Sequence, residues 1–509
     1  MRKYAIPVTL CLAAGVAAPA YGSTPDLSAE SLSSLSSIGS STVGVGFDAL
    51  SSSPVKGTLD GPAGTKAGEL NERKRVGLRS ERIRYTTTNE RGELVPVTGA
   101  LYTTPKAKGL VALAPGTRGL GDQCAPSYGA AMLSTVGSSE SEAPTVNINY
   151  EAPMVKMLTD AGYSVVVTDY IGLGTSGLHS YLNRVEQGNA LIDAARATAE
   201  PGQKVAFWGY SQGGGAAAAA AELVADYAPE LNVVATFSGA APADPLAVLE
   251  QGTAPMLTAV AGFATASYMD TYPEFNEAMS EYLTPTGKAW LEGLKTSCII
   301  EASATSPTDF SELFTSGKDF AELVRSDDRL RTYLDHNKVG TRPVSAPIMV
   351  LTNPDDDLVP SPQATQLAED YCTIGAPVEY RRVVVPGSPT QPLSSTLEKA
   401  SERSSLPTNR YPGSNHAIPL VLETGHAIDW LNDRFDGKPM KTVCPADAEP
   451  YVAWDGLNAV EIAAIVLGVF GAIGLAAAPF VVPYLAAYLA LYAEELRRNI
   501  PPQLLQYLP

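Results

Sequence analysis

Residues 209–213 read Gly-Tyr-Ser-Gln-Gly and form a G-x-S-x-G motif between two contrasting segments. The preceding run, residues 204–208, is largely apolar and strand-like, whereas residues 214–227 are rich in alanine and predict a helix. In this strand–turn–helix setting, the motif is typical of a sharp turn that projects a serine hydroxyl from the end of a sheet. Glycines two residues before and after the serine let the neighbouring backbone approach closely. The motif therefore predicts an α/β sheet that presents Ser211 as a nucleophile.

Other apolar runs alternate with helical stretches and extend this sheet. Two alternating runs joined by a turn at residues 89–92 predict an antiparallel opening pair. The later runs are continuously apolar, as strands buried on both faces are, and helices are predicted between them, for example over residues 184–198 and 216–227. We therefore expect a mostly parallel sheet with helices on both faces. The expected strands are residues 82–88, 95–102, 110–114, 164–168, 205–208, 233–237, 348–351 and 378–385.

The helical pattern changes over residues 244–342, which contain helical segments rich in Ala, Leu and Phe and no clear strand. We interpret this segment as a helical cap inserted over the active site. It divides the predicted core into a first part, residues 75–243, and a second part, residues 343–445.

The start of the sequence is typical of an exported protein. Residues 1–22 contain a charged start, an apolar stretch and the small-residue sequence Ala18-Pro19-Ala20, which together predict a signal peptide. Residues 23–60 are dominated by serine, glycine and other small residues, and they predict a flexible leader because they have too few bulky apolar side chains to form a core. We therefore expect the mature protein to be secreted or held in the cell envelope.

Residues 455–509 form a hydrophobic C-terminal segment. Within it, residues 462–493 contain no charged side chain, although Pro479 and Pro483 interrupt the run. A membrane span needs about 20 apolar residues. Three interpretations remain open: a C-terminal membrane anchor, a hydrophobic hairpin at a membrane surface, or a helix pair packed on the domain.

The net charge and the numbers of cysteines and histidines limit which ligands, metals and disulfides the protein is expected to have. The formal net charge of −18 argues against nucleic-acid binding, which needs clustered Lys and Arg. The chain has only four histidines and no pair of cysteines at C-x-x-C spacing, so we expect neither a metal site nor a cofactor. Four of the five cysteines remain after removal of the signal peptide, an even number that favours two disulfides, and the sequence alone allows three pairings.

A serine nucleophile needs a histidine base and an acid, and in this type of sheet they follow in the order Ser, acid, His. The acid is expected in the loop after a late strand, where the expected strand 348–351 is followed by Asp355, Asp356 and Asp357. We choose Asp356 as the acid. His416 and His426 are the two candidate bases downstream.

Backbone amides near the serine are expected to bind the oxyanion of a tetrahedral intermediate. The amide of Gln212 follows the nucleophile directly. The second donor should come from the loop after the expected strand 110–114, which places it at Thr117, with Arg118 as the alternative.

Several segments together resemble the secretory lipase family of α/β-hydrolases, the lipase A type of yeasts and its bacterial relatives. The similarity spans about residues 75–445 and is carried by residues 116–127, 168–181, 209–214, 356–360 and 430–439. The resemblance implies the α/β-hydrolase fold and disulfides Cys124–Cys298 and Cys372–Cys444. It also favours His416 over His426, because His416 has the spacing from Trp430 that the family's base has. The chain departs from the family in a Ser- and Pro-rich insertion between Pro386 and Pro412.

Residues 172–177 match a second motif, G-x-G-x-x-G, which in other proteins binds dinucleotides. A dinucleotide-binding turn should lead directly into an apolar helix, but Leu178-His179-Ser180-Tyr181 follows here. In the family that the chain resembles, this glycine turn shapes the pocket wall. We therefore interpret Asp169 and His179 as structural or pocket-lining residues.

These features predict a secreted serine hydrolase. We expect a triacylglycerol lipase that acts at a lipid interface, with Ser211, Asp356 and His416 as catalytic residues and residues 256–264 of the cap lining the acyl pocket. The alternatives are a carboxylesterase for small soluble or cell-envelope esters and a binding or structural protein that has kept the fold without catalysis.

Overall fold

The computed structural model describes residues 62–64, 66–75, 78–129, 134–138, 144–250, 254–308, 312–384 and 413–452. The predicted signal peptide, leader, insertion and hydrophobic tail lie outside these ranges, and so does the apolar run 462–493. Within the described ranges, no helix combines the length and the apolar character needed to cross a membrane.

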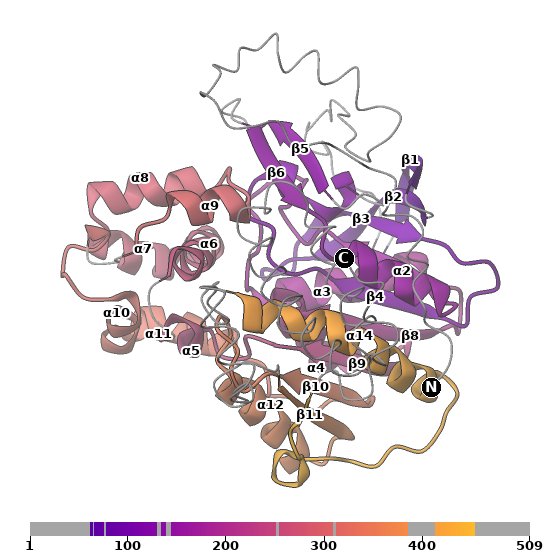
Figure 1. The fold of residues 1–509 in the computed structure, drawn as a ribbon. Coiled ribbons are helices and arrows are strands. Elements are labelled where there is room, and N and C mark those ends of the chain that lie inside the picture. Colours follow the sequence, from indigo (N-terminus) through magenta and orange to yellow (C-terminus); the bar gives the residue numbers. More distant parts are fainter. Residues whose placement is uncertain are drawn as a thin grey trace, which may run out of the picture.

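A mixed sheet of ten strands forms the centre of the described part (Figure 1). Its order is β1-β2-β3-β7-β4-β8-β9-β10-β11-β12. The pairs β1–β2, β2–β3 and β3–β7 are antiparallel, and all pairs from β7–β4 to β11–β12 are parallel. The strands are β1 Lys66–Arg75, β2 Leu78–Thr88, β3 Leu94–Tyr102, β4 Leu110–Ala114, β7 Ser164–Thr168, β8 Lys204–Tyr210, β9 Asn232–Gly239, β10 Ile348–Thr352, β11 Val378–Val384 and β12 Tyr451–Val452.

The strand predictions are confirmed, and the structure adds strands that the sequence did not indicate. Each predicted run forms a strand, and β2 and β3 make the expected antiparallel pair, with Thr88 opposite Leu94. Strand β1 begins at Lys66, ahead of the predicted core boundary at residue 75, and its polar sequence gave no apolar signal because it lies at the sheet edge. A separate hairpin of β5 (Ser134–Ser138) and β6 (Pro144–Ile148) was also missed.

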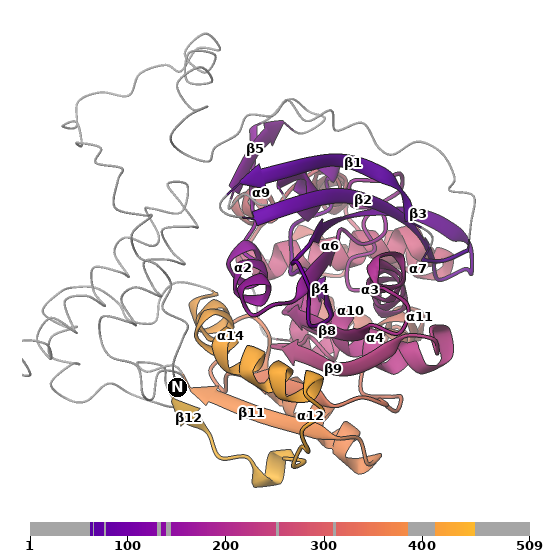
Figure 2. The same ribbon diagram turned by 90° about the vertical axis from the view of Figure 1, so that its right-hand side faces the viewer.

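Helices cover both faces of the sheet. Successive side chains of a strand point to opposite faces, and those of the central strands are apolar on both, so each face is buried under helices. Val111 and Leu113 belong to a core cluster with α2 (Ala152–Asp160) and α14 (Ser414–Phe435). Leu110 and Ala112 belong to the cluster of the other face. That face is covered by α3 (Arg184–Thr198), α4 (Gln212–Tyr227) and α12 (Ser361–Thr373). Figure 2 shows α2 and α14 to the left of the sheet and α3 and α4 to its right.

The segment between β9 and β10 forms a helical cap with its own apolar core. Figure 1 shows these helices grouped together to one side of the sheet. They are α5 Pro245–Leu249, α6 Pro255–Thr271, α7 Pro273–Tyr282, α8 Pro285–Leu294, α9 Ile299–Thr305, α10 Phe320–Ser326 and α11 Asp328–His336.

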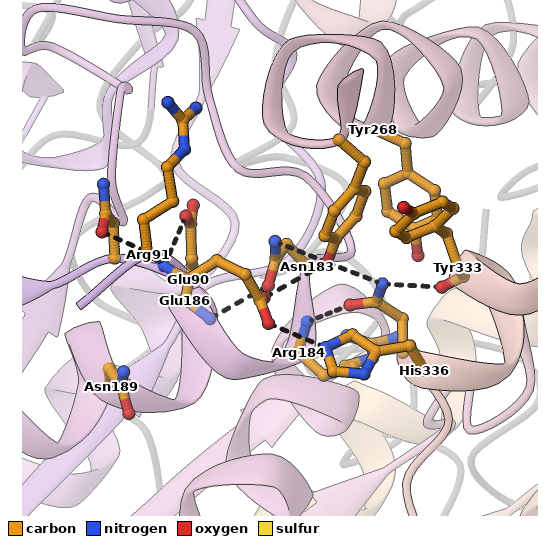
Figure 3. A network of polar contacts seen from close by, with 12 residues as sticks. Glu90, Arg91, Asn183, Arg184, Glu186, Asn189, Tyr268, Tyr333 and His336 are labelled. Atoms are coloured by element: carbon orange, nitrogen blue, oxygen red, sulfur yellow. Dashed lines mark hydrogen bonds and ion pairs between the residues drawn. The ribbon is translucent and has the colours of Figure 1, made fainter. Parts of the chain in front are cut away.

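A polar network, exposed at His336 and buried at Asn183 and Asn337, joins the cap to the core (Figure 3). His336 Nε2 lies 2.7 Å from Glu90 Oε1, at the turn between β2 and β3, and this hydrogen bond raises the pKa of His336. The side-chain amides of Asn183 and Asn337 each donate to the hydroxyl of Tyr272, at 3.1 Å. The C-terminal end of α11 is therefore held against the core at the start of α3.

Candidate active site

Ser211 occupies a strained turn between β8 and α4. Its backbone has φ 59° and ψ −127°, which L-residues rarely adopt. The Ser211 amide donates to Gly239 O at 2.9 Å, and its carbonyl accepts from Gly215 N at 3.2 Å. A strained non-glycine residue held by hydrogen bonds on both sides is typical of functional sites.

The glycines of the motif are required by close backbone contacts. A Cβ atom on Gly209 would lie 1.9 Å from Gly213 O, and a Cβ on Gly213 would lie 2.0 Å from Ala114 O. Neither distance leaves room for a carbon atom, so a side chain at either position would push the turn apart. The second contact also shows that the turn packs against the end of β4.

Asp356 and His416 form a buried pair. His416 Nδ1 lies 2.8 Å from Asp356 Oδ2 and 3.0 Å from Asp356 Oδ1. Oδ1 also accepts from the backbone amides of Leu358 and Val359, at 2.9 and 2.8 Å. These bonds fix the carboxylate, which in turn fixes the orientation of the imidazole and the tautomer that carries its hydrogen on Nδ1.

The surroundings of His416 favour its protonated form. Burial by itself lowers the pKa of the imidazole, but the negative charge and hydrogen bond of Asp356, together with the charge of Asp357, outweigh it and raise the pKa of His416. A tautomer with hydrogen on Nδ1 leaves Nε2 as an acceptor.

His416 packs directly against the strand that leads to the serine. Its ring centroid lies 5.4 Å from that of Tyr210, and the Tyr210 hydroxyl donates to His416 O at 2.6 Å. Because Tyr210 precedes Ser211 in the chain, the structure brings the Asp356–His416 pair to the side of the nucleophile turn.

The neighbouring Asp357 has a different role from Asp356. Asp357 Oδ2 accepts from Gly413 N at 2.7 Å and Oδ1 accepts from His416 N at 3.0 Å, at the start of α14. A carboxylate at a helix N-terminus is favourable because it meets unpaired N–H groups and the positive end of the dipole. Burial raises the pKa of Asp357, and the charge of Asp356 adds to this. Asp357 therefore holds the backbone that carries His416.

The alternative base, His426, lies in a different environment on α14. Its ring is half-exposed, and its Nδ1 lies 3.3 Å from Glu423 Oε2 on the same helix. Its ring centroid lies 6.4 Å from that of Tyr451. Neither partner belongs to the turn around Ser211, so the structure brings His416 and not His426 to this turn.

The loop after β4 is held close to the nucleophile turn. Tyr170 donates its hydroxyl hydrogen to Pro115 O at 2.8 Å, and Glu151 Oε1 accepts from Gly116 N at 2.8 Å. Thr117 O accepts from the Tyr150 hydroxyl at 2.9 Å. These contacts fix the backbone on both sides of the candidate amide of Thr117, for which no acceptor is recorded among the described residues.

Arg118, the alternative donor, is anchored by its side chain. Its guanidinium is buried, forms an ion pair with Glu151 and donates to Asn149 Oδ1 at 2.9 Å. It also stacks 4.4 Å from the ring centroid of Tyr150. Sequence reasoning missed Tyr150 and Glu151 because they come from a segment far from the motif and support the loop only through tertiary contacts.

A second buried imidazole, His179, contacts the turn from its other side. The side-chain amide of Gln212 lies 3.1 Å from His179 Nε2, and His179 Nδ1 lies 3.3 Å from Ile171 O. Burial lowers the pKa of His179 to about 4. The glycine turn that carries it folds back on itself, since a Cβ on Gly172 would lie 2.0 Å from Leu178 O.

Asp169 is a structural residue at the end of β7. It is fully buried and accepts hydrogen bonds from Thr98 Oγ1 at 2.7 Å and from the Ser127 amide at 2.8 Å. These bonds join β3, the loop after β4 and the loop after β7.

Both disulfide pairings implied by the resemblance are present. Cys124–Cys298 joins the loop after β4 to the residue before α9, and Cys372–Cys444 joins α12 to the segment after α14. The first bond links the core to the cap close to the candidate oxyanion loop.

Comparison with known proteins identifies the family. The family model for secretory lipases matches residues 138–442, more than half of the chain. The chain belongs to the secretory lipase family. This range contains Ser211, Asp356 and His416.

The relatives with similar sequences include proteins named as lipases and one named as a probable inactive lipase. Lipase A of Arthroderma benhamiae is 28% identical over 334 residues, 63% of this chain and 62% of that protein. The secreted triacylglycerol lipase LIP5 of Malassezia globosa is 24% identical over 368 residues, 69% of each chain. A probable inactive lipase of Mycobacterium tuberculosis is 25% identical over 304 residues, 57% of this chain and 59% of that protein. The chain thus matches less than two thirds of the length of two of these relatives.

Solved structures share the fold. Candida antarctica lipase A in its closed state has a TM-score of 0.59 at 17% identity, with 81% of this chain and 91% of that chain covered. The rice cell wall degrading esterase LipA of Xanthomonas oryzae has a TM-score of 0.54 at 18% identity, with 74% and 100% covered. The fold is therefore that of an α/β-hydrolase with an inserted cap.

Proposed function

We propose that this protein is a secreted triacylglycerol lipase, which hydrolyses carboxylic esters of acylglycerols through an acyl-enzyme on Ser211. The observation that carries the proposal is the buried Asp356–His416 pair held against Tyr210, the residue that precedes the strained Ser211. One family member is named a probable inactive lipase, so membership of the family does not by itself imply activity.

In the proposed reaction, Ser211 Oγ attacks the ester carbonyl while His416 Nε2 takes its proton. The imidazolium then gives this proton to the leaving alcohol, and water releases the acyl group by the same steps. Asp356 keeps the hydrogen on Nδ1 of His416 and stabilises the imidazolium, which agrees with the raised pKa of His416.

Two backbone amides would bind the negative oxygen of the tetrahedral intermediate. The Gln212 amide belongs to the first residue of α4, where N–H groups have no partner within the helix. The Thr117 amide lies in the loop fixed by Tyr150 and Glu151. Each such donor contributes about 3 kcal/mol to the stability of the transition state.

We propose that helix α6 lines the acyl pocket. Near its start, Met256 Sδ lies 3.8 Å from the position of a Cβ on Gly413, at the loop that leads into α14. In its middle, the ring of Phe263 contacts that of Tyr181, whose hydroxyl lies 2.7 Å from Thr117 Oγ1. The helix therefore extends from the His416 side of the site to the Thr117 side. Its sequence is predominantly apolar and suits a long acyl chain.

A direct experiment measures hydrolysis of triglycerides and of p-nitrophenyl esters from acetate to palmitate by the signal-free protein and by Ser211→Ala. We expect the highest rates with long-chain esters, covalent labelling of the wild type by a fluorophosphonate and loss of both with Ser211→Ala. Absence of labelling in the wild type would contradict the proposal.

The second candidate is a carboxylesterase for small soluble or cell-envelope esters. It is favoured by the similarity to the Xanthomonas oryzae structure, which is named a cell wall degrading esterase. The same series of esters separates the two, because a preference for acetate and butyrate would select the esterase.

We further propose that residues 462–493 keep the enzyme at a membrane or lipid surface. Their uncharged composition supports this, and the substrate would lie in the same place. Activity on emulsified triglyceride should fall when residues after Val452 are removed, a truncation that keeps β12, whereas activity on soluble esters should be unchanged. Release of the full-length protein from membranes by high salt and alkali would contradict the anchor.

A further inference from the structure

Arg184 places a buried positive charge under the nucleophile turn. It is the first residue of α3, and its side chain is almost fully buried, with 3% of the residue exposed. Figure 3 draws it as part of the network that joins cap and core, in which its backbone amide donates to Asn337 Oδ1 at 2.8 Å. Its guanidinium points instead to the first turn of α4, because a Cβ on Gly215 would lie 2.4 Å from the guanidinium carbon.

All recorded acceptors of this guanidinium are neutral. Nη2 donates to Pro242 O at 2.7 Å, and Nη1 donates to Gln187 Oε1 at 3.1 Å and to Gln212 O at 3.4 Å. Among the described residues, Arg184 forms no ion pair, the carboxylate of Glu222 on α4 acts on its charge only at longer range, and its Nε has no hydrogen-bond partner. Burial accordingly lowers the pKa of Arg184.

Arg118 shows what the fold does elsewhere with a buried guanidinium. It is as deeply buried as Arg184, but it forms an ion pair with Glu151. A buried charge without such a partner is costly. Arg184 has no carboxylate in direct contact among the described residues, so the more distant Glu222 offsets its burial only in part.

The position of Arg184 adds to this cost. The N-terminus of a helix carries a partial positive charge, so a cation is unfavourable there. The guanidinium contacts the first turn of α4, the turn that begins with Gln212. Both the helix and the arginine thus place positive potential at the residue that follows Ser211.

We propose that Arg184 is a positioning residue for ester hydrolysis, whose charge stabilises the oxyanion through the first turn of α4 and whose hydrogen bond to Gln212 O holds the peptide that follows the Gln212 amide. The inference rests on the proposed function of Ser211. During the reaction, the carbonyl carbon becomes tetrahedral when Ser211 Oγ adds to it, and the electron pair of the C=O bond moves to the oxygen. This charge exists only in the transition state and the intermediate, so Arg184 should affect kcat much more than KM.

Gln187→Glu gives the sharpest test, because it neutralises the charge and keeps the arginine. Gln187 Oε1 already accepts from Arg184, while its Nε2 is buried without a partner, so a carboxylate of the same shape loses no hydrogen bond. We expect kcat for p-nitrophenyl butyrate to fall about 30-fold, equivalent to about 2 kcal/mol. KM should change less than about threefold and the melting temperature should not fall. Unchanged kcat in Gln187→Glu would overturn the proposal.

Variants of Arg184 provide the second test. Arg184→Gln should lower kcat by a similar factor, and Arg184→Lys, which keeps a cation, should recover most of it. Butaneboronic acid binds serine hydrolases as a tetrahedral anion, and its affinity should follow kcat across the variants. Equal losses in Arg184→Lys and Arg184→Gln, or boronate affinity that does not change, would indicate a purely structural role and overturn the proposal.

Asn337→Ala is the matched control for packing. It removes the hydrogen bonds to the Arg184 amide and to Tyr272 without changing any charge. It should lower the melting temperature and leave kcat within about threefold. A wild-type protein without esterase activity and without fluorophosphonate labelling would refute the proposed function itself, whereas an active, labelled wild type with a fully active Gln187→Glu would refute only the role of Arg184.

Discussion

Two buried imidazoles contact the residues on either side of Ser211, and the two regions around them differ in charge. On one side, His416 packs on Tyr210 and meets the carboxylate of Asp356. On the other side, His179 accepts from the Gln212 side chain and donates to the carbonyl of Ile171.

The two imidazoles are buried to a similar degree, but their pKa values move in opposite directions. Asp356 and Asp357 raise the pKa of His416, whereas the pKa of His179 falls to about 4 because its burial outweighs its hydrogen bond to Ile171 O and no carboxylate of the described residues offsets it. Depth in the protein is therefore not what prepares an imidazole to take a proton. The adjacent acid does this, and it must be held in place by the rest of the fold.

The largest expected effect comes from removing the two imidazoles in turn. His416→Ala should lower kcat roughly 10⁴- to 10⁶-fold, as loss of the base does in other serine hydrolases. His179→Gln, which keeps a hydrogen-bonding side chain beside Gln212, should lower it at most about tenfold. The measurement is kcat for p-nitrophenyl butyrate at neutral pH. Comparable losses of kcat in both variants would contradict the assignment of His416, and not His179, as the base.

Replacing the three adjacent carboxylates one at a time tests the acid. Asp356→Asn should lower kcat roughly 10⁴-fold, because the amide no longer stabilises the imidazolium. Asp357→Asn should cost about tenfold to 100-fold by loosening the start of α14. Asp355→Asn is the control, with kcat within about threefold, and a larger loss from it than from Asp356→Asn would show that the acid is misassigned.

The pKa of His179 predicts a stability effect of intermediate size. Its pKa is about 4 in the folded state and about 6.5 in the unfolded chain, so the unfolded chain binds a proton first as the pH falls. The contribution of His179 to stability is therefore complete above pH 6.5 and decreases by about 3 kcal/mol on going to pH 4.

Urea unfolding of the wild type and of His179→Gln between pH 7 and pH 4 measures this effect. The variant should lose less stability over this window than the wild type does. His416 acts with the opposite sign, because its pKa is raised on folding, and the stability that it contributes is lost as the pH rises through its folded-state pKa. Parallel curves for the wild type and His179→Gln would contradict the buried, neutral state of His179.

The smallest effect is expected for His426. Its half-exposed ring pairs with the buried carboxylate of Glu423 on the same helix, which also accepts from the Tyr451 hydroxyl and keeps that bond when His426 is removed. His426→Ala should leave kcat within about twofold and change the free energy of unfolding by about 1 kcal/mol. A large loss of kcat would reopen the choice between the two candidate bases.

The sequence predicted those parts of the fold in which local pattern and tertiary role coincide. The central strands are apolar on both faces, and the turn around Ser211 needs glycines at fixed positions, so both leave a local trace. The polar strand β1 at the sheet edge leaves none. The hairpin of β5 and β6 was missed in the same way.

The residues of the candidate site also differ in whether the sequence could locate them. Ser211 and the run of three aspartates could be located from sequence, and the family resemblance favoured His416. The separate contacts of Asp356 and Asp357 could not be derived, because they depend on where α14 begins in space. Arg184 gave no signal either, since an arginine at the start of a helix reads as a surface residue until the packing of α3 on α4 is known.

The Cys124–Cys298 bond has a mechanical consequence for substrate entry. Beside this bond, Ile299 N donates to Arg118 O at 2.8 Å and Leu120 N donates to Ser297 O at 3.0 Å. The stretch leading into α9 is thus fastened to the loop that carries Thr117 by both covalent and backbone links. Any displacement of this part of the cap must therefore also move the loop that carries Thr117, so in the proposed lipase the binding of the acyl chain and the binding of the oxyanion would be mechanically linked.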